Sequence, residues 1–74
     1  MNAPKDSPQA HLAHLEAVVR QRVSGLVRSL HIVVEENGLV LNGSARTYYA
    51  KQLAQHAAMN ACPLPIRANR IEVG

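Results

Sequence analysis

The sequence predicts an α+β domain, a two-layer αββαβ sandwich in which two helices pack on one face of a three-stranded mixed sheet. In two stretches, apolar residues recur every three or four positions, which is the spacing of one face of a helix. Three shorter runs carry the β-branched or alternating apolar residues of strands, and Asn37-Gly38, a strong hairpin signal, separates the first two runs.

The length of the chain limits what it can do. At 74 residues it can form one domain, and we expect a flexible N-terminal tail over residues 1–7 followed by a single domain over residues 8–74. A chain of this size buries only about 60% of its unfolded surface, which leaves little room for a deep catalytic cavity. We therefore expect a protein that is not an enzyme.

The compartment follows from what the sequence contains. The single cysteine, Cys62, excludes an internal disulfide, and a small domain without disulfides favours a reducing compartment. The N-terminal residues contain no apolar run of signal-peptide length, and no stretch reaches the roughly 18 apolar residues of a transmembrane segment. We expect a soluble cytoplasmic protein with no transmembrane segment.

The first helix is expected to begin at Ser7-Pro8, because a serine hydroxyl caps a helix and proline suits its first position. The glycine of Ser24-Gly25 is expected to end it, and residues 27–29 form a short connection. The apolar face consists of Leu12, Leu15, Val19, Val23 and Leu26.

A β-hairpin is expected next, with strands over residues 30–36 and 39–43 joined by a two-residue turn at Asn37-Gly38. Gly43 is expected to end the second strand. We therefore expect Gly38 and Gly43 to have structural roles rather than to form a phosphate-binding loop.

The two-residue turn also sets the register and faces of this hairpin. Glu36 should face Leu39, and the buried face should hold Ile32, Val34, Leu39 and Leu41. Val33 and Val40 should lie on the opposite face. Because that face is moderately apolar, we expect the first helix or a partner chain to cover it.

The second helix is expected over residues 48–61, capped by Thr47 and ended by the prolines of Cys62-Pro63-Leu64-Pro65. Small residues dominate its buried stripe, which lets the helix lie close to the sheet. The buried stripe consists of Tyr49, Ala50, Leu53, Ala54, Ala57, Ala58 and Ala61. The side expected to be exposed consists of Lys51, Gln52, Gln55 and Met59.

The last strand is expected over residues 66–73. Its apolar residues change parity around Asn69, which predicts a bulge or a late start of the strand at that residue.

The element order, the segment Asn37-Gly38-Leu39-Val40-Leu41-Asn42-Gly43 and the ending Asn69-Arg70-Ile71-Glu72-Val73 together resemble a BON domain, a small bacterial module. The resemblance covers about residues 15–73. The stretch from Arg46 to Gln55 is similar to short single-domain members in which a Tyr-Tyr pair opens the second helix. The loop Cys62-Pro63-Leu64-Pro65 departs from the glycine-hydrophobic pair usual in the family. The resemblance implies attachment to phospholipid surfaces or hydrophobic partners, and it offers no catalytic residues.

Candidate catalytic and metal-binding residues are few. His11 and His14 are three residues apart, but His31, His56 and Cys62 would all have to converge on them, so we expect no metal and no cofactor. A Cys62 nucleophile paired with His56 has only proximity in the sequence behind it. The adjacent Glu35 and Glu36 should point to opposite faces of a strand and cannot share a substrate.

The candidate binding residues are Arg46, Tyr48, Tyr49, Lys51 and Gln52. Adjacent helical residues point about 100° apart, so only one tyrosine can face the core fully, and the other should be exposed. An exposed tyrosine between basic residues can lie among lipid headgroups, anchor a partner or stack on a base. The alternative is that both tyrosines pack as the only aromatic residues of the core and its rim.

These observations favour a non-catalytic binding module of the BON type that engages a protein partner or an anionic phospholipid surface. The net charge of +3 leaves open a small single-stranded nucleic-acid-binding protein, although the basic residues form no cluster in the sequence. The third alternative is a homo-oligomer with a structural role, in which copies of the chain enlarge a thin core.

Overall fold

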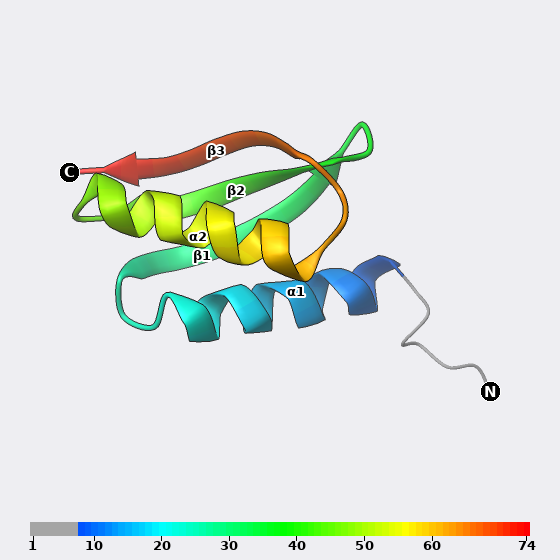
Figure 1. The fold of residues 1–74 in the computed structure, drawn as a ribbon, viewed down its shortest axis with the longest axis horizontal. Coiled ribbons are helices and arrows are strands. Elements are labelled where there is room, and N and C mark those ends of the chain that lie inside the picture. Colours follow the sequence, from blue (N-terminus) through cyan, green and yellow to red (C-terminus); the bar gives the residue numbers. More distant parts are fainter. Residues whose placement is uncertain (1–7) are drawn as a thin grey trace.

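The computed structural model describes residues 8–74 and confirms the predicted fold class (Figure 1). The predicted tail over residues 1–7, including the Ser7 cap, lies outside the described residues. In chain order, the elements are α1 (Pro8–Arg22), β1 (Val27–Glu35), β2 (Gly38–Ala45), α2 (Tyr48–Ala61) and β3 (Ile66–Val73).

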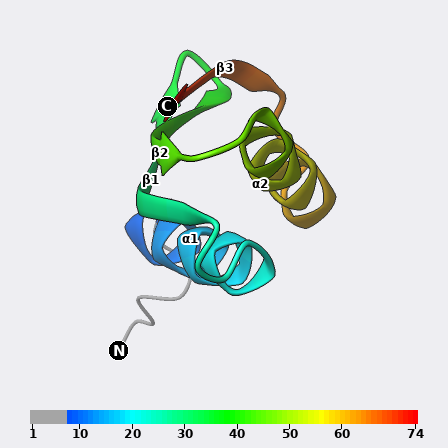
Figure 2. The same ribbon diagram turned by 90° about the vertical axis from the view of Figure 1, so that its left-hand side faces the viewer.

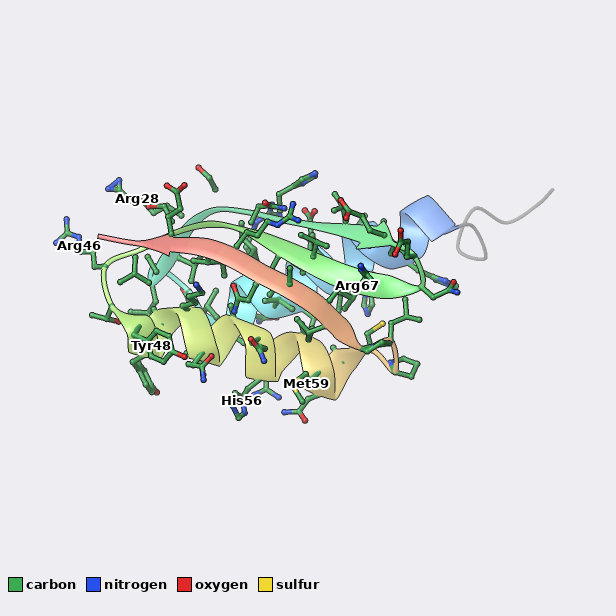
Figure 3. All side chains as sticks on the ribbon, turned by 90° about the horizontal axis from the view of Figure 1, so that it is seen from above. Arg28, Arg46, Tyr48, His56, Met59 and Arg67 are labelled. Carbon is green, nitrogen blue, oxygen red and sulfur yellow. The ribbon has the colours of Figure 1, made fainter. Side chains whose placement is uncertain are left out.

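The three strands form one mixed sheet in the order β1-β2-β3, with β1 antiparallel and β3 parallel to β2. Viewed along the long axis of the molecule, α2 lies against one face of the sheet, and α1 lies beside α2 near β1 (Figure 2). Both helices are on the same side of the sheet (Figure 2), and β3 runs alongside α2 (Figure 3). α1 therefore does not cover the face that carries Val33 and Val40, and the first of the two alternatives predicted for that face is wrong.

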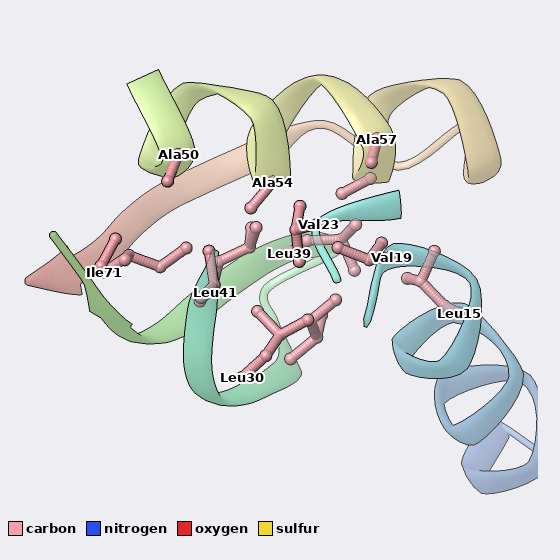
Figure 4. Close-up of a cluster of buried hydrophobic side chains, with 14 residues drawn as sticks. Leu15, Val19, Val23, Leu30, Leu39, Leu41, Ala50, Ala54, Ala57 and Ile71 are labelled. Atoms are coloured by element: carbon pink, nitrogen blue, oxygen red, sulfur yellow. The ribbon is translucent and has the colours of Figure 1, made fainter. Parts of the chain in front are cut away.

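The core lies between this sheet and the two helices (Figure 4). The sheet contributes larger aliphatic side chains such as Ile32, Leu39 and Ile71, whereas α2 contributes only alanines to the fully buried set. Such small side chains allow α2 to approach the sheet closely. The alanines are Ala50, Ala54, Ala57 and Ala58.

The predicted apolar face of α1 is correct except at its end. Leu15, Val19 and Val23 are buried, but Leu26 is 46% exposed. The helix ends at Arg22, and Gly25 with φ +76° closes a turn in which the Leu26 amide donates to the Val23 carbonyl at 2.7 Å. Leu26 therefore no longer follows the helical spacing.

The hairpin turn lies one residue earlier than predicted. Glu36 and Asn37, with φ of 50° and 64°, occupy the two turn positions, and Glu35 pairs with Gly38. Val34 therefore pairs with Leu39 rather than with Leu41. This shift by two residues keeps Ile32, Leu39 and Leu41 on the buried face, because side chains alternate with a period of two. Val34, however, is exposed at the open end of the hairpin.

Gly38 has a different role from the predicted turn position. A Cβ at Gly38 would collide with the Arg67 side chain, which crosses this position to place its Nη2 3.2 Å from Glu36 Oε1. The absence of a side chain at Gly38 thus lets Arg67 of β3 reach Glu36 in the hairpin turn.

Both hairpin strands extend further than predicted. β1 begins at Val27, where a connection was expected, and β2 continues past Gly43 to Ala45. The register shifts between Arg28 and His31, where Ser29 has φ +55°. A Cβ on Gly43 would lie 3.0 Å from the Arg28 carbonyl oxygen, so this glycine accommodates the bulge rather than ending the strand.

The bounds predicted for β3 are correct, but its irregularity is not at Asn69. The register with β2 shifts between Ile66 and Ala68, which makes Arg67 the extra residue. Asn69 faces α2, and its Nδ2 donates to the Lys51 carbonyl at 3.1 Å and to Gln55 Oε1 at 3.2 Å. Its Oδ1 accepts from the Ile71 amide at 3.2 Å. Asn69 therefore links β3 to α2.

Candidate interaction surface on α2

The start of α2 is fixed by the predicted cap. Thr47 has extended backbone angles, and its Oγ1 accepts a hydrogen bond from the Ala50 amide at 3.1 Å. This cap satisfies one of the free amides of the first helical turn. It places Tyr48 and Tyr49 at the first two helical positions.

The four buried alanines decide where the other α2 side chains point. With about 100° between successive residues, the side opposite the alanines holds five residues, which we call the α2 outward stripe. They are Tyr48, Tyr49, Gln52, His56 and Met59. Figure 3 shows Tyr48, His56 and Met59 on the side of α2 that faces away from the sheet.

Both tyrosines are exposed, which contradicts the expectation that one would face the core and the alternative that both would pack. Tyr48 is 63% and Tyr49 68% exposed, and Met59 is 54% exposed at the other end of the stripe. The physical reason is that Ala50 and Ala54 take the positions closest to the sheet. Tyr48 and Tyr49 then fall on either side of the outward direction. Ala61, predicted to be buried, is also exposed.

The charges around the stripe are basic. α2 contains no acidic residue, and its one lysine is Lys51. Arg46 is exposed just before the helix. Lys51 is half-buried and lies on the flank that faces β3, where its carbonyl accepts from Asn69. The structure therefore offers a mainly uncharged stripe with two cations near its N-terminal end.

The five predicted site residues do not all lie on one surface. Tyr48, Tyr49 and the half-buried Gln52 belong to the outward stripe, whereas Lys51 flanks it and Arg46 precedes it. His56 and Met59 also belong to the stripe, although they were not among the predicted site residues. The spacing of three and four residues from Tyr49 through Gln52 was the signal that could have found them.

An open depression of about 310 Å³ lies at the end of the molecule where α2 begins. The turn between α1 and β1 and the loop between β2 and α2 both line this depression, the first with Leu26 and the second with Thr47. Two cations also line it, Arg28 from the start of β1 and Arg46 from the loop before α2. In Figure 3 these two arginines extend from this end of the molecule.

The other residues considered from the sequence do not converge on one site. Within residues 8–74, no group of three or more His, Cys, Asp or Glu side chains is arranged to hold a metal ion. Cys62 is half-buried and packs against the core, whereas His56 is exposed on the outward stripe. Glu36 is in the hairpin turn and pairs with Arg67 rather than projecting from a strand.

Comparison with known proteins gives no identification. No family model, no curated protein and no solved structure matches the chain. Between Pro8 and Gly74, no helix has both the length and the apolar character needed to cross a membrane.

Proposed function

We propose that this protein is a non-catalytic binding module, of the BON type that its sequence resembles, and that its α2 outward stripe attaches to anionic phospholipid surfaces. One observation carries the proposal. The only aromatic residues of the chain, Tyr48 and Tyr49, are exposed together on a helix with no acidic residue.

Core packing does not account for this arrangement. The sheet side of α2 is filled by alanines with the half-buried Leu53, while Tyr48, Tyr49 and Met59 project outward from the opposite side. Tyrosine suits a membrane interface because its ring is apolar and its hydroxyl remains hydrated. Met59 would add apolar contact at the other end of the stripe. The outward stripe thus has the composition of a surface that rests among lipid headgroups.

The basic residues support the choice of an anionic surface. Each arginine or lysine near such a membrane contributes about 1 kcal/mol of attraction, and salt screens that attraction. Arg46 and Lys51 lie close to the tyrosines, and α2 has no carboxylate to oppose them. We therefore propose docking by shallow insertion of the tyrosines, assisted by positive charge.

The test is cosedimentation with vesicles of phosphatidylcholine alone and of phosphatidylcholine mixed with phosphatidylserine. The chain should bind the anionic vesicles and release as salt is raised. The double variant Tyr48→Ser with Tyr49→Ser should lower the partition coefficient at least about tenfold, which corresponds to roughly 1.4 kcal/mol. Equal binding by the variant and the unmodified chain, or no binding to anionic vesicles, would contradict the proposal.

Matched controls separate the stripe from a general surface effect. Val34 is an exposed apolar residue on β1, away from α2, so Val34→Thr should leave vesicle binding unchanged. Arg46→Gln should weaken binding more than Arg70→Gln on β3. Because both tyrosines are exposed, their variants should change the free energy of unfolding by no more than about 0.5 kcal/mol, measured by urea titration.

A parallel titration with single-stranded oligonucleotides distinguishes the main alternative. Stacked bases would also use exposed tyrosines, and such binding would weaken steeply with salt. Tyrosine-dependent binding to oligonucleotides without binding to anionic vesicles would overturn the lipid proposal in favour of nucleic acid.

A further inference from the structure

The face of the sheet opposite the helices carries an ordered pattern of charge. No helix among residues 8–74 covers this face, which we call the outer sheet face (Figure 2). In its middle, Val33, Val40 and Ala68 form a row across the three strands. Val40 is almost completely buried by its neighbours, while Val33 and Ala68 are half-buried.

One end of the outer sheet face has a cation on one edge and an anion on the other. Ser44 of β2 pairs with Arg28 of β1 and with Glu72 of β3. Because the three residues share a row, their side chains emerge on the same face. Arg28 therefore occupies the β1 corner and Glu72 the β3 corner, and both are exposed.

At the other end, the signs are reversed. Glu35 occupies the β1 corner opposite Gly38, and the Arg67 side chain comes from β3 over Gly38. Arg67 pairs with Glu36, but the side chains of the pair remain 47% and 78% exposed, so the guanidinium stays accessible. The four corners thus alternate in sign, and the hairpin end, with two glutamates and one arginine, is net negative.

This pattern is complementary to itself. Consider a second copy turned about a two-fold axis that lies between the sheets and runs across the strands. Arg28 of one copy then faces Glu35 of the other, and Glu72 faces Arg67. The negative hairpin end meets the opposite end, where Arg70, two residues before Glu72 on β3, adds a second cation. Sheets stacked face to face lie about 10 Å apart, a gap that opposed Arg and Glu side chains can span.

The edges of the sheet are less available to a partner strand than the face is. On β1, the Ile32 amide donates to Glu16 Oε2 and the Leu30 carbonyl accepts from Arg20 Nη2, each at 2.9 Å. On β3, the Ile71 amide is held by Asn69. Backbone groups that bind side chains in this way cannot pair freely with a new strand.

We propose that two copies of this chain associate through the outer sheet face, with Arg28 against Glu35 and Glu72 against Arg67 across the two-fold axis. The contact is small. Strands of eight or nine residues give a three-stranded face about 26 Å long and about 14 Å wide. The area of such a face is below the roughly 800 Å² that each partner buries in a standard interface. The dimer is therefore weak, and it forms at high protein concentration.

Sedimentation equilibrium over a concentration series to the millimolar range tests this proposal. The chain should show a monomer–dimer equilibrium that shifts toward monomer as salt is raised. Arg28→Glu alone and Glu35→Arg alone should each weaken dimerisation about tenfold, because each reversal affects two symmetry-related pairs. The double variant should restore dimerisation, since the corner charges are then exchanged but still complementary.

Two further measurements keep the outcome specific. Arg22→Glu, on α1 and outside the sheet face, should leave the dimerisation constant unchanged. Amide chemical shifts followed by NMR on dilution should change in the strands and remain constant in α2. A monomer at all concentrations, dilution shifts confined to α2, or rescue of Arg28→Glu by Glu72→Arg in place of Glu35→Arg would each overturn the proposed arrangement.

Discussion

The two helices of this domain use their side chains in opposite ways. α1 turns bulky residues such as Leu15 and Val19 inward and uses Glu16 and Arg20 to bind the edge of β1. α2 turns mainly alanines inward and turns both tyrosines and Met59 outward. The polar and apolar residues of α1 described above therefore stabilise the fold, whereas the outward side chains of α2 contribute little to it and are free for another role.

Truncating the inward side of α1 should have the largest effect on stability. Leu15→Ala removes a buried side chain and leaves a cavity, so we expect it to lower the free energy of unfolding by about 2–5 kcal/mol. Urea titration followed by circular dichroism measures this change. Leu26→Ala is the matched control, because Leu26 is exposed and should lose less than about 1 kcal/mol. Similar losses at both positions would contradict the packing described for α1.

Enlarging the inward side of α2 should be the next largest effect. Ala54 is completely buried against the sheet, so Ala54→Leu adds volume that the core cannot accommodate without strain. We expect a loss of about 1–3 kcal/mol in thermal or urea unfolding. Gln52→Leu places the same side chain on the outward stripe, where the change should stay within about 0.5 kcal/mol. If Gln52→Leu were the more destabilising variant, the orientation of α2 would be wrong.

Removing the polar contact between α1 and β1 should have the smallest effect of the three. Glu16→Ala leaves the Ile32 amide without its acceptor and the Arg20 guanidinium without its ion pair. We expect a loss of about 1–2 kcal/mol and faster hydrogen exchange of the Ile32 amide. Glu35→Ala serves as the control, because the exposed Glu35 should contribute no more than about 0.5 kcal/mol. Unchanged exchange at Ile32 would show that Glu16 does not protect this edge.

The order and type of the elements could be predicted because local patterns determine them. The alanine stripe and the Thr47 cap gave the bounds of α2, and the alternating residues gave those of β3. The hairpin register could not be predicted as well. Asn37-Gly38 favours a turn at those two residues, but the close approach of Arg67 requires glycine at position 38, and this contact depends on a residue far away in sequence.

The candidate site was only partly predictable, because its orientation also depends on contacts between elements. Helical spacing could show that Tyr48 and Tyr49 point in different directions, but not which direction the sheet occupies. The buried alanines settle that point, because they leave both tyrosines and Met59 on the solvent side. The roles of Glu16 and Asn69 depend on contacts between elements, and no local pattern in the sequence indicates them.

Placing both helices on one side of the sheet has a consequence for any pair of copies that stack through their outer sheet faces. The two α2 helices would then form opposite exteriors of a four-layer particle, with their tyrosines pointing in opposite directions. A flat bilayer could contact only one of them at a time. Such a pair would act as a tether, able to hold two membranes together, rather than as a stronger anchor to one.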